Sequence, residues 1–239
     1  MARIDAQLCA REVDLDTPFR FSEVCRRRFG RYDVRNYGMD TPAFDATLLD
    51  ADAPWLPFVH RLLGEDAVSL WHGIVDNRPG SKDQAWHRDG EHLFPHVHLP
   101  PHCITLFIPL CDCAEDMGPT HFYPGSHALW REGKYVGVAD DVCHLPSVAP
   151  LMRGGGMIAF DYRVIHRGSA NTNTVNRPYL YLVFARSWFR DVENFTDERL
   201  FPDTVAAHTV VEDAAPKGGN LVSEPFAAPA VIGEAPQKG

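Results

Sequence analysis

Short runs of β-forming residues, separated by turns, most constrain the fold of this chain. The longest apolar run is Tyr179–Trp188, and a second, Cys103–Leu110, has the sequence CITLFIPL. β-Branched and aromatic residues favour strands, whereas the Gly, Pro, Asn and Asp residues between the runs favour turns. Short strands that alternate with turns, rather than with helical segments, are typical of β-sandwiches and barrels. The sequence therefore predicts a mainly β fold.

Further strands are expected on the same grounds. The segments are Ala67–Val75, Thr120–Tyr123 and Gly156–Phe160. The first runs into the turn sequence DNRPG, the second into Pro124-Gly125, and the third begins at the end of a triple-glycine turn. Pro109 is expected near the end of its strand, where its missing N–H is tolerated.

The length suits one large β domain, and the two ends of the chain differ from its core. Residues 1–64 are expected to form a helical and irregular part, with a helix over Trp55–Leu63 that stops at the following glycine. The β-rich core is expected over about residues 67–195 of a single domain, residues 1–211. The Ala-, Pro- and Gly-rich residues 212–239 are expected to form a loosely ordered tail or an extended strap over the core.

The charge balance argues against a nucleic-acid partner. The formal net charge of the 239 residues is -9, and the pI is about 5.7. Proteins that bind phosphate backbones usually carry a basic face. The one dense basic run is Arg26-Arg27-Arg28 with Arg31. Two interpretations of it remain: a solvated helix face, or a dock for an anionic substrate group such as phosphate.

The N-terminus and the cysteines predict a cytoplasmic protein. No apolar run opens the chain, and no stretch approaches the roughly 18 apolar residues of a membrane span. We therefore expect a soluble monomer or small homo-oligomer with no membrane partner, in which the six cysteines are reduced. Cys111-Asp112-Cys113 has no second Cys pair at zinc-site spacing, which favours buried or loop thiols over a metal site.

His87-Arg88-Asp89 is the strongest candidate for a metal site. Side chains at positions i and i+2 of a strand point to the same side, so His87 and Asp89 can face one metal. A third ligand must come from another strand, and His166 lies between two predicted strands. Two imidazoles and one carboxylate are the facial triad of non-haem Fe(II) oxygenases. Arg177, eleven positions after His166, offers a guanidinium fork for a carboxylate.

A zinc site is the competing interpretation of this His-rich region. Four histidines follow the triplet: His92, His96, His98 and His102. Prolines interrupt any helical i, i+4 spacing among them, which argues against a dedicated zinc site. A loop over the mouth of the pocket, or plain surface, fits these histidines better.

Three separated segments resemble the phytanoyl-CoA dioxygenase family, which belongs to the Fe(II)/2-oxoglutarate oxygenases. They are Trp86–Gly90, Gly118–His127, and His166–Gly168 followed by Arg177-Pro178. The resemblance spans about Ala67–Phe195 and implies a double-stranded β-helix, or jelly roll, with flanking helices. His87, Asp89 and His166 would then be the catalytic metal ligands. Arg177 would bind the far carboxylate of 2-oxoglutarate.

Fe(II), 2-oxoglutarate and O2 are the cofactor and co-substrates that the resemblance implies. The expected reaction is hydroxylation of a small-molecule substrate, coupled to decarboxylation of 2-oxoglutarate to succinate. Related halogenases lack the carboxylate ligand, so the presence of Asp89 favours hydroxylation. The alternatives are desaturation or cyclisation on the same scaffold, a cupin-like isomerase or dioxygenase without 2-oxoglutarate, and a non-catalytic metal- or small-molecule-binding protein.

Two further positions bear on 2-oxoglutarate binding. Thr105 either donates its hydroxyl to the carboxylate that Arg177 would hold or is a β-favouring core residue. Many relatives carry a hydroxyl residue two positions after the distal His. This chain has Gly168 at that position and Ser169 next to it, so the usual hydroxyl contact is in doubt.

Substrate contacts are expected from residues around the metal centre. The candidates are His92, Phe94, Trp130 and Arg190. Core packing is the alternative for the aromatic side chains. Arg190 would select an anionic substrate, and its alternative is a salt bridge with Asp191 or Glu193.

Overall fold

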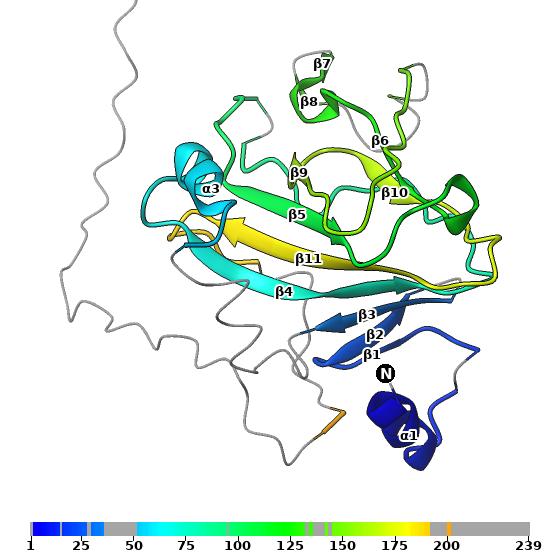
Figure 1. Cartoon of the computed structure of the whole chain (residues 1–239). Coiled ribbons are helices and arrows are strands. Elements are labelled where there is room, and N and C mark those ends of the chain that lie inside the picture. Colours follow the sequence, from blue (N-terminus) through cyan, green and yellow to red (C-terminus); the bar gives the residue numbers. More distant parts are fainter. Residues whose placement is uncertain are drawn as a thin grey trace, which may run out of the picture. The chain divides into compact units, whose positions relative to one another are not determined.

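The described part of the chain is built on a seven-stranded sheet (Figure 1). The computed structural model describes residues 2–14, 16–27, 30–35, 52–94, 96–131, 134–135, 142, 145–191 and 200–201. The spatial order of the strands is β1 (Phe19–Arg20), β2 (Val24–Arg27), β3 (Arg31–Arg35), β4 (Val68–Asn77), β11 (Arg177–Ala185), β5 (Cys103–Pro109) and β9 (Ile158–Asp161). Every neighbouring pair runs antiparallel.

A smaller antiparallel layer accompanies this sheet (Figure 1). It pairs β6 (Thr120–Phe122) with β10 (His166–Gly168), and single bridges add His87 beside His166 and Val148 beside Phe122. The remaining elements are α1 (Ala2–Ala10), α3 (Leu56–Leu63), the 3-10 turns η2 (Glu115–Met117) and η3 (Ser126–Ala128), and the hairpin of β7 (Trp130–Arg131) and β8 (Lys134–Tyr135). The prediction of a mainly β jelly roll with flanking helices is confirmed.

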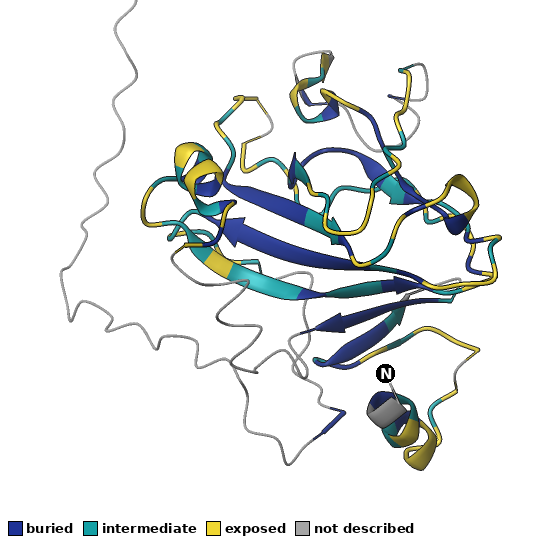
Figure 2. Cartoon of the chain, in the orientation of Figure 1, coloured by how far each residue is buried: buried dark blue, intermediate teal, exposed yellow. Residues whose placement is uncertain are grey.

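The large sheet has one apolar face and one face that carries polar groups. Leu180 and Leu182 of β11 pack with Leu106 of β5 in a buried cluster that includes residues of α3. Tyr179 and Tyr181 alternate with these leucines, point to the opposite face, and line a cavity. Figure 2 shows β5 and β11 as mostly buried strands at the centre of the sheet. Hydrophobic burial on one face therefore leaves the other face available for a site.

Residues 19–35 form three strands, so the prediction of a helical N-terminal part was wrong for this segment. On β3, Tyr32 and Val34 pack with α1 in a second apolar cluster. Arg31 and Asp33 alternate with them and line the cavity on the other face. Charged residues are rarely buried, so the alternation of Arg31 and Asp33 with Tyr32 and Val34 did not indicate a strand in the sequence.

The basic run does not form a helix face, which corrects the first interpretation of it. Arg26 and Arg27 lie in β2, and Arg31 begins β3 with only 1% of its surface exposed. Arg28 lies outside the described residues. Of this run, Arg31 is the residue that reaches the cavity.

The elements predicted from residue 55 onward are confirmed with small shifts. α3 ends at Leu63, and Gly64 follows it with a φ of 105° that favours glycine. β5 ends at Pro109, as expected from the missing N–H. β11 begins at Arg177 and ends at Ala185, so it starts earlier and stops earlier than the apolar run suggested.

The five described cysteines are free thiols. No helix in the described ranges has the length and apolar character needed to cross a membrane. Residues 1–205 group as one compact unit, and the predicted tail, residues 212–239, lies outside the described residues. The single domain over residues 1–211 stays a prediction.

Asn77, the last residue of β4, joins the two layers at one end of the fold. Its Nδ2 lies 3.3 Å from the carbonyl oxygen of Met117, 3.4 Å from that of Gly118 and 3.2 Å from that of Ser169. Gly118 has a φ of 75°, and a side chain there would collide with the carbonyl oxygen of Ser169. Asn77 thus fastens the end of β4 to the start of β6 and the end of β10.

Gly73 in β4 leaves room for a side chain that crosses this strand. The register places it between Arg35 of β3 and Tyr181 of β11. The hydroxyl of Tyr181 donates to Asp33 Oδ1 at 2.9 Å, on the far side of β4. A Cβ on Gly73 would lie 2.5 Å from Tyr181 Oη and 2.5 Å from the carbonyl oxygen of Val34. Position 73 therefore requires glycine, because the Tyr181 hydroxyl and the Val34 carbonyl oxygen approach its backbone closely.

Gly73→Ala is expected to lower the free energy of unfolding by about 1–3 kcal/mol, because the added methyl group overpacks this crossing. Urea unfolding followed by circular dichroism measures the change. Ser69→Ala, at an exposed position of the same strand, is the matched control and should stay within about 0.5 kcal/mol of the parent protein. Equal stability of Gly73→Ala and the parent would contradict the crossing.

Candidate metal centre

His87 and His166 face each other as a pair across two antiparallel segments. The backbone N–H of His87 donates to the carbonyl oxygen of His166 at 3.0 Å, and the N–H of His166 donates back at 2.9 Å. In such a pair both side chains project to the same face. The two imidazole rings accordingly lie with their centroids 4.5 Å apart.

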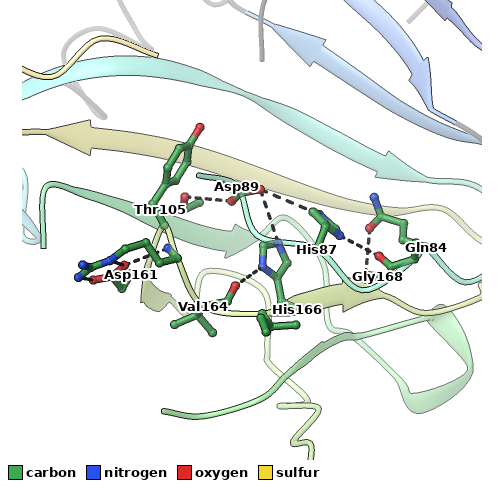
Figure 3. A network of polar contacts seen from close by, with 12 residues as sticks. Gln84, His87, Asp89, Thr105, Asp161, Val164, His166 and Gly168 are labelled. Atoms are coloured by element: carbon green, nitrogen blue, oxygen red, sulfur yellow. Dashed lines mark hydrogen bonds and ion pairs between the residues drawn. The ribbon is translucent and has the colours of Figure 1, made fainter. Parts of the chain in front are cut away.

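Each imidazole is oriented by a backbone carbonyl. Nδ1 of His87 lies 2.9 Å from the carbonyl oxygen of Ala85. Nδ1 of His166 lies 2.9 Å from the carbonyl oxygen of Val164 (Figure 3). A carbonyl oxygen can only accept, so each Nδ1 carries a proton, and in the neutral ring this arrangement leaves the lone pair on Nε2. Carbonyl partners of this kind fix metal-ligating histidines in many proteins.

Asp89 brings a carboxylate to the two Nε2 atoms. Its Oδ1 lies 4.0 Å from Nε2 of His87 and 3.7 Å from Nε2 of His166. Its backbone N–H donates to the carbonyl oxygen of Tyr162 at 3.0 Å, and Thr105 Oγ1 donates to Oδ2 at 3.5 Å. These bonds position Asp89. The sequence predicted a regular strand around this residue, but within the triplet 87–89 only His87 pairs with a neighbouring strand, through its bridge to His166.

Gly90, the residue after Asp89, allows a neighbouring ring to pack closely against the backbone. A Cβ on Gly90 would lie 2.5 Å from Cδ1 of Tyr162. The ring of Tyr162 therefore covers the backbone beside the carboxylate, and its hydroxyl donates to Asp191 Oδ2 at 2.6 Å. Burial raises the pKa of this phenol, so it remains a neutral donor.

His87, Asp89 and His166 form the one group of potential metal ligands found within the described residues. One ligand atom from each lies within 4.8 Å of the others. The side chain of His166 is buried, whereas 32% of the His87 side chain and 26% of the Asp89 side chain are exposed. Three protein ligands on one side and an open side towards a cavity suit a facial metal site.

A cavity of about 90 Å³ lies beside these three residues and contains Arg177. Arg177 begins β11 and is 1% exposed. Its guanidinium carbon lies 4.1 Å from the centre of the Tyr179 ring, and its Nε has no hydrogen-bond partner in the described part of the chain. A buried guanidinium with an unmet donor, facing a cavity, suits an anionic ligand.

Several other cavity residues were not singled out from the sequence. They are Asp33, Arg35, Gln84, Tyr162, Tyr179 and Tyr181, whereas Arg31 belongs to the basic run noted in the sequence. Arg31 Nη2 donates to the carbonyl oxygen of Ser169 at 2.7 Å. The signal that could have identified the β3 residues is the alternation of charged residues with Tyr32 and Val34, once that segment is recognised as a strand.

Asp33 is the centre of a buried polar network at the cavity. Arg35 Nε and Nη2 each lie 2.9 Å from Asp33 Oδ2, and Tyr181 donates to Oδ1. Cys25 Sγ lies 3.6 Å from Oδ2. Burial and the neighbouring carboxylate raise the pKa of Tyr181, which keeps the phenol a donor. Through this network, the side of the cavity formed by β3 carries paired charges rather than an isolated charge.

The predicted substrate residues are not part of this cavity lining. Phe94 and Trp130 are exposed, and Trp130 packs edge-on against Tyr135 at 4.9 Å. Arg190 donates to the carbonyl oxygens of Ser187 and Phe189 at 2.7 and 2.9 Å, and Glu193 lies outside the described residues. Substrate contact by these residues stays a prediction.

Thr105 and His92 have other contacts in the structure. The hydroxyl of Thr105 points to Asp89, so its contact with 2-oxoglutarate also stays a prediction. His92 stacks on Tyr135 with ring centroids 3.7 Å apart. Burial, with smaller contributions from Arg163 and Arg88, lowers the pKa of His92 to about 4.

The family model for phytanoyl-CoA dioxygenase matches residues 26–179, which is more than half of the chain. The chain belongs to the phytanoyl-CoA dioxygenase family. This confirms the family that the three motifs predicted, and the match includes the N-terminal strand β3 as well as the candidate ligands and Arg177.

Two curated fungal proteins are related to parts of this chain. Dioxygenase cnsJ of Penicillium expansum is 36% identical over 126 residues, which are 48% of this chain and 36% of that protein. Dioxygenase hkm4 of Aspergillus hancockii is 29% identical over 105 residues, which are 42% of this chain and 32% of that protein. The match thus covers about a third of the length of each relative.

Solved structures share the fold at low sequence identity. AviO1 from Streptomyces viridochromogenes Tue57 has a TM-score of 0.56 and 22% identity, over 80% of this chain and 86% of its own. SnoK, a non-haem alpha-ketoglutarate-dependent carbocyclase from nogalamycin biosynthesis, has a TM-score of 0.55 and 19% identity, over 78% and 76%. EctD from S. alaskensis, solved with 2-oxoglutarate and 5-hydroxyectoine, has a TM-score of 0.54 and 19% identity, over 77% and 66%.

His92 is expected to reduce stability as the pH falls. Its pKa of about 4 in the folded chain lies below the ordinary value of 6.5, so the unfolded chain binds the proton more readily. The stability that the neutral ring contributes is complete above about pH 6.5 and is lost between there and about pH 4.

His92→Phe keeps a ring on Tyr135 and removes the titration. Below pH 6.5 the parent should therefore lose stability relative to this variant, as measured by thermal unfolding across the pH range. His96→Phe, at an exposed position of the same loop, is the control and should follow the parent. Parallel pH profiles of the parent and His92→Phe would contradict the prediction.

Proposed function

We propose that this chain is an Fe(II)- and 2-oxoglutarate-dependent dioxygenase that hydroxylates a small molecule. The observation that carries the proposal is the convergence of two Nε2 atoms and one carboxylate at a cavity. The same cavity holds the buried fork of Arg177. Membership of the phytanoyl-CoA dioxygenase family and the shared fold of SnoK and EctD support it.

The donor set fits a resident Fe(II). In His87 and His166 the Nδ1 atoms are already bonded to carbonyl oxygens, which leaves the Nε2 atoms to face a metal, and Asp89 supplies a carboxylate. Two imidazoles and a carboxylate with open positions are typical of non-haem Fe(II) oxygenases. Bound iron, with 2-oxoglutarate and O2, supplies the oxidising chemistry, and the chain supplies ligand geometry and shielding from water.

Arg177 fits the far carboxylate of 2-oxoglutarate. A planar guanidinium can hold a carboxylate through two parallel charge-assisted bonds. The Tyr179 ring beside it restricts its orientation, and the phenol stays neutral because burial raises its pKa. An unmet Nε donor in this buried position gives the carboxylate a defined partner.

Hydroxylation is the proposed outcome because the carboxylate ligand Asp89 is present and leaves no ligand position for chloride. SnoK shows that proteins of this fold also include a carbocyclase. Succinate detection across a panel of small molecules identifies the substrate. The product formed from that substrate under 18O2 then separates the reactions. Hydroxylation places labelled oxygen in this product, whereas cyclisation and desaturation do not.

Addition of Fe(II) and 2-oxoglutarate without oxygen is expected to produce a weak visible charge-transfer band. His166→Ala should abolish both the band and stoichiometric iron, because it removes one of three ligands. His121→Ala is the matched control on the neighbouring strand β6, where His121 pairs with Arg167 rather than with a ligand. The proposal fails if the parent gives no band and His87→Ala changes neither metal content nor 2-oxoglutarate binding.

Arg177→Gln is expected to weaken 2-oxoglutarate binding on the order of 100-fold, because it removes the charge-assisted pair. Iron content should stay unchanged, since Arg177 is not a ligand. Succinate formation as a function of 2-oxoglutarate concentration measures the effect, with Arg61→Gln on the exposed side of α3 as control. Turnover that is indifferent to Arg177→Gln would favour a cupin-like enzyme without 2-oxoglutarate.

A further inference from the structure

We propose that Phe189, on the turn of residues 186–191 that follows β11, limits the size of the substrate group that reaches the metal. A hydrogen bond between Tyr162 and Asp191 holds this turn in place. The group that fits against the turn is uncharged and apolar. The proposal rests on the function proposed above and deepens it, because it assigns the substrate end of the same cavity.

The cavity has two ends along β11. Every second residue from Arg177 to Val183 lines it, since alternate residues of a strand project to one face. Val183 pairs with Thr105 of β5, and Thr105 donates to Asp89 Oδ2 (Figure 3). Arg177 therefore marks one end, and the Asp89 carboxylate lies towards the other. A 2-oxoglutarate molecule held at both ends fills the stretch between them, which leaves the space beyond Val183 for a substrate.

Apolar side chains surround the space beyond Val183. The next pair on the same face is Ala185 with Cys103, and both residues are fully buried. They form one apolar cluster with Val183 and Tyr162, and Phe189 packs against this cluster. Because the last pair of the sheet has small side chains, the ring of Phe189 determines how much room remains. A charged group would lose its hydration here, so an uncharged group fits better.

Tyr162 connects the turn to the candidate metal ligand. Its carbonyl oxygen accepts the N–H of Asp89 at 3.0 Å and the N–H of Gly90 at 3.1 Å. Its side chain lines the cavity, is 4% exposed with the rest of the residue, and donates through its hydroxyl to Asp191 Oδ2 at 2.6 Å. The Tyr162 ring thus lies between the carboxylate ligand and the turn, so the bond to Asp191 fixes the wall of the cavity.

The start of the turn is held by three other segments. Arg186 donates from its backbone N–H to the carbonyl oxygen of His102 at 2.9 Å, and from Nε to that of Pro101 at 2.9 Å. Its Nη2 donates to the carbonyl oxygen of Leu62 at 3.2 Å. The N–H of Phe189 donates to the Arg186 carbonyl oxygen at 2.9 Å, and the Phe189 ring lies 4.7 Å from the His102 ring. These bonds fix the start of the turn, and the phenol–carboxylate bond fixes its end.

A purely structural role for the turn would be to cover the end of the sheet. The two roles differ in what they predict for compounds of different size and charge. A structural defect weakens binding of every compound, including 2-oxoglutarate. A change in a substrate wall instead alters the preference among compounds and leaves 2-oxoglutarate and iron in place.

The test is an anaerobic titration of the protein loaded with Fe(II) and 2-oxoglutarate, followed by the shift of its charge-transfer band. The probes are cyclohexanol, cyclohexanecarboxylate and cyclohexylamine, which share one ring and differ in charge. Cyclohexanol is expected to bind more tightly than either charged compound, on the order of 10-fold. Absence of a shift with cyclohexanol would overturn the assignment. Tighter binding of the carboxylate would also overturn it and would favour an anionic substrate selected by Arg190.

The size limit is tested with adamantanol, a bulkier uncharged probe. Phe189→Ala should improve binding of adamantanol relative to cyclohexanol on the order of 10-fold, because it removes the ring that closes the cavity. Phe189→Leu should shift the ratio in the same direction by less, and it serves where Phe189→Ala does not fold. Trp188→Ala is the matched control on the same turn, where Trp188 is 60% exposed, and it should keep the ratio of the parent.

The bond that holds the turn is tested by a double-mutant cycle. Tyr162→Phe keeps the ring and removes the hydroxyl, and Asp191→Asn removes the charge that accepts from it. Each change should reduce the discrimination between the two alcohols. The double variant should show little further loss, because both changes remove the same bond. Fully additive effects would contradict the role of this bond.

Two results would overturn the role of Phe189 while leaving the proposed function intact. One is a Phe189→Ala variant with the same ratio of adamantanol to cyclohexanol binding as the parent. The other is a variant that loses both alcohols and 2-oxoglutarate to the same extent, which indicates a structural role. A parent protein that gives no charge-transfer band with Fe(II) and 2-oxoglutarate would instead refute the proposed function and this inference together.

Discussion

The reciprocal backbone hydrogen bonds between His87 and His166 are the constraint on which the candidate site depends. They place two histidines, far apart in sequence, opposite each other and on one face. The carbonyl oxygens of Ala85 and Val164 then turn both rings so that Nε2 is available to a metal. Asp89 joins them because its backbone is bonded to Tyr162, on the segment that leads into β10. The geometry of the candidate metal centre is thus a consequence of strand pairing rather than of side-chain contacts alone.

The two faces of the large sheet have different roles: the outer face packs apolar side chains, and the inner face lines the candidate site. Its outer face packs apolar side chains against α3 and α1, which is the source of hydrophobic stabilisation. Its inner face holds Arg31, Arg177 and the Asp33 network, whose charges are buried but bonded or face the cavity. Glycines at positions 73 and 168 mark where side chains from other strands cross or approach the backbone. Buried charge of this kind is costly unless it is paired or bound to a ligand, which agrees with a site for an anion.

The jelly roll and the grouping of His87, Asp89 and His166 could be predicted because their signals are local. Apolar runs identified β4, β5, β11 and α3, and the motifs indicated a family that the family model then confirmed. The roles of the three residues as ligands and of Arg177 in 2-oxoglutarate binding stay predictions. β3 was missed because Arg31, Asp33 and Arg35 occupy its inner positions, and only the tertiary structure brings Ser169 to Arg31 and Tyr181 to Asp33. Arg190 was chosen for its charge, yet it bonds to nearby carbonyl oxygens. The contacts of Arg190 are local, whereas the partners of Arg31 and Asp33 come from distant segments that no local pattern contains.

The central claim is that one metal binds between His87, Asp89 and His166, with the far end of 2-oxoglutarate on Arg177. A crystal structure of the protein grown without oxygen in the presence of Fe(II) and 2-oxoglutarate tests it most directly. The predicted result is iron bound by both Nε2 atoms and the Asp89 carboxylate, with the keto acid chelating it and its far carboxylate on Arg177. Iron bound elsewhere, or a keto acid whose far carboxylate does not reach Arg177, would contradict the claim.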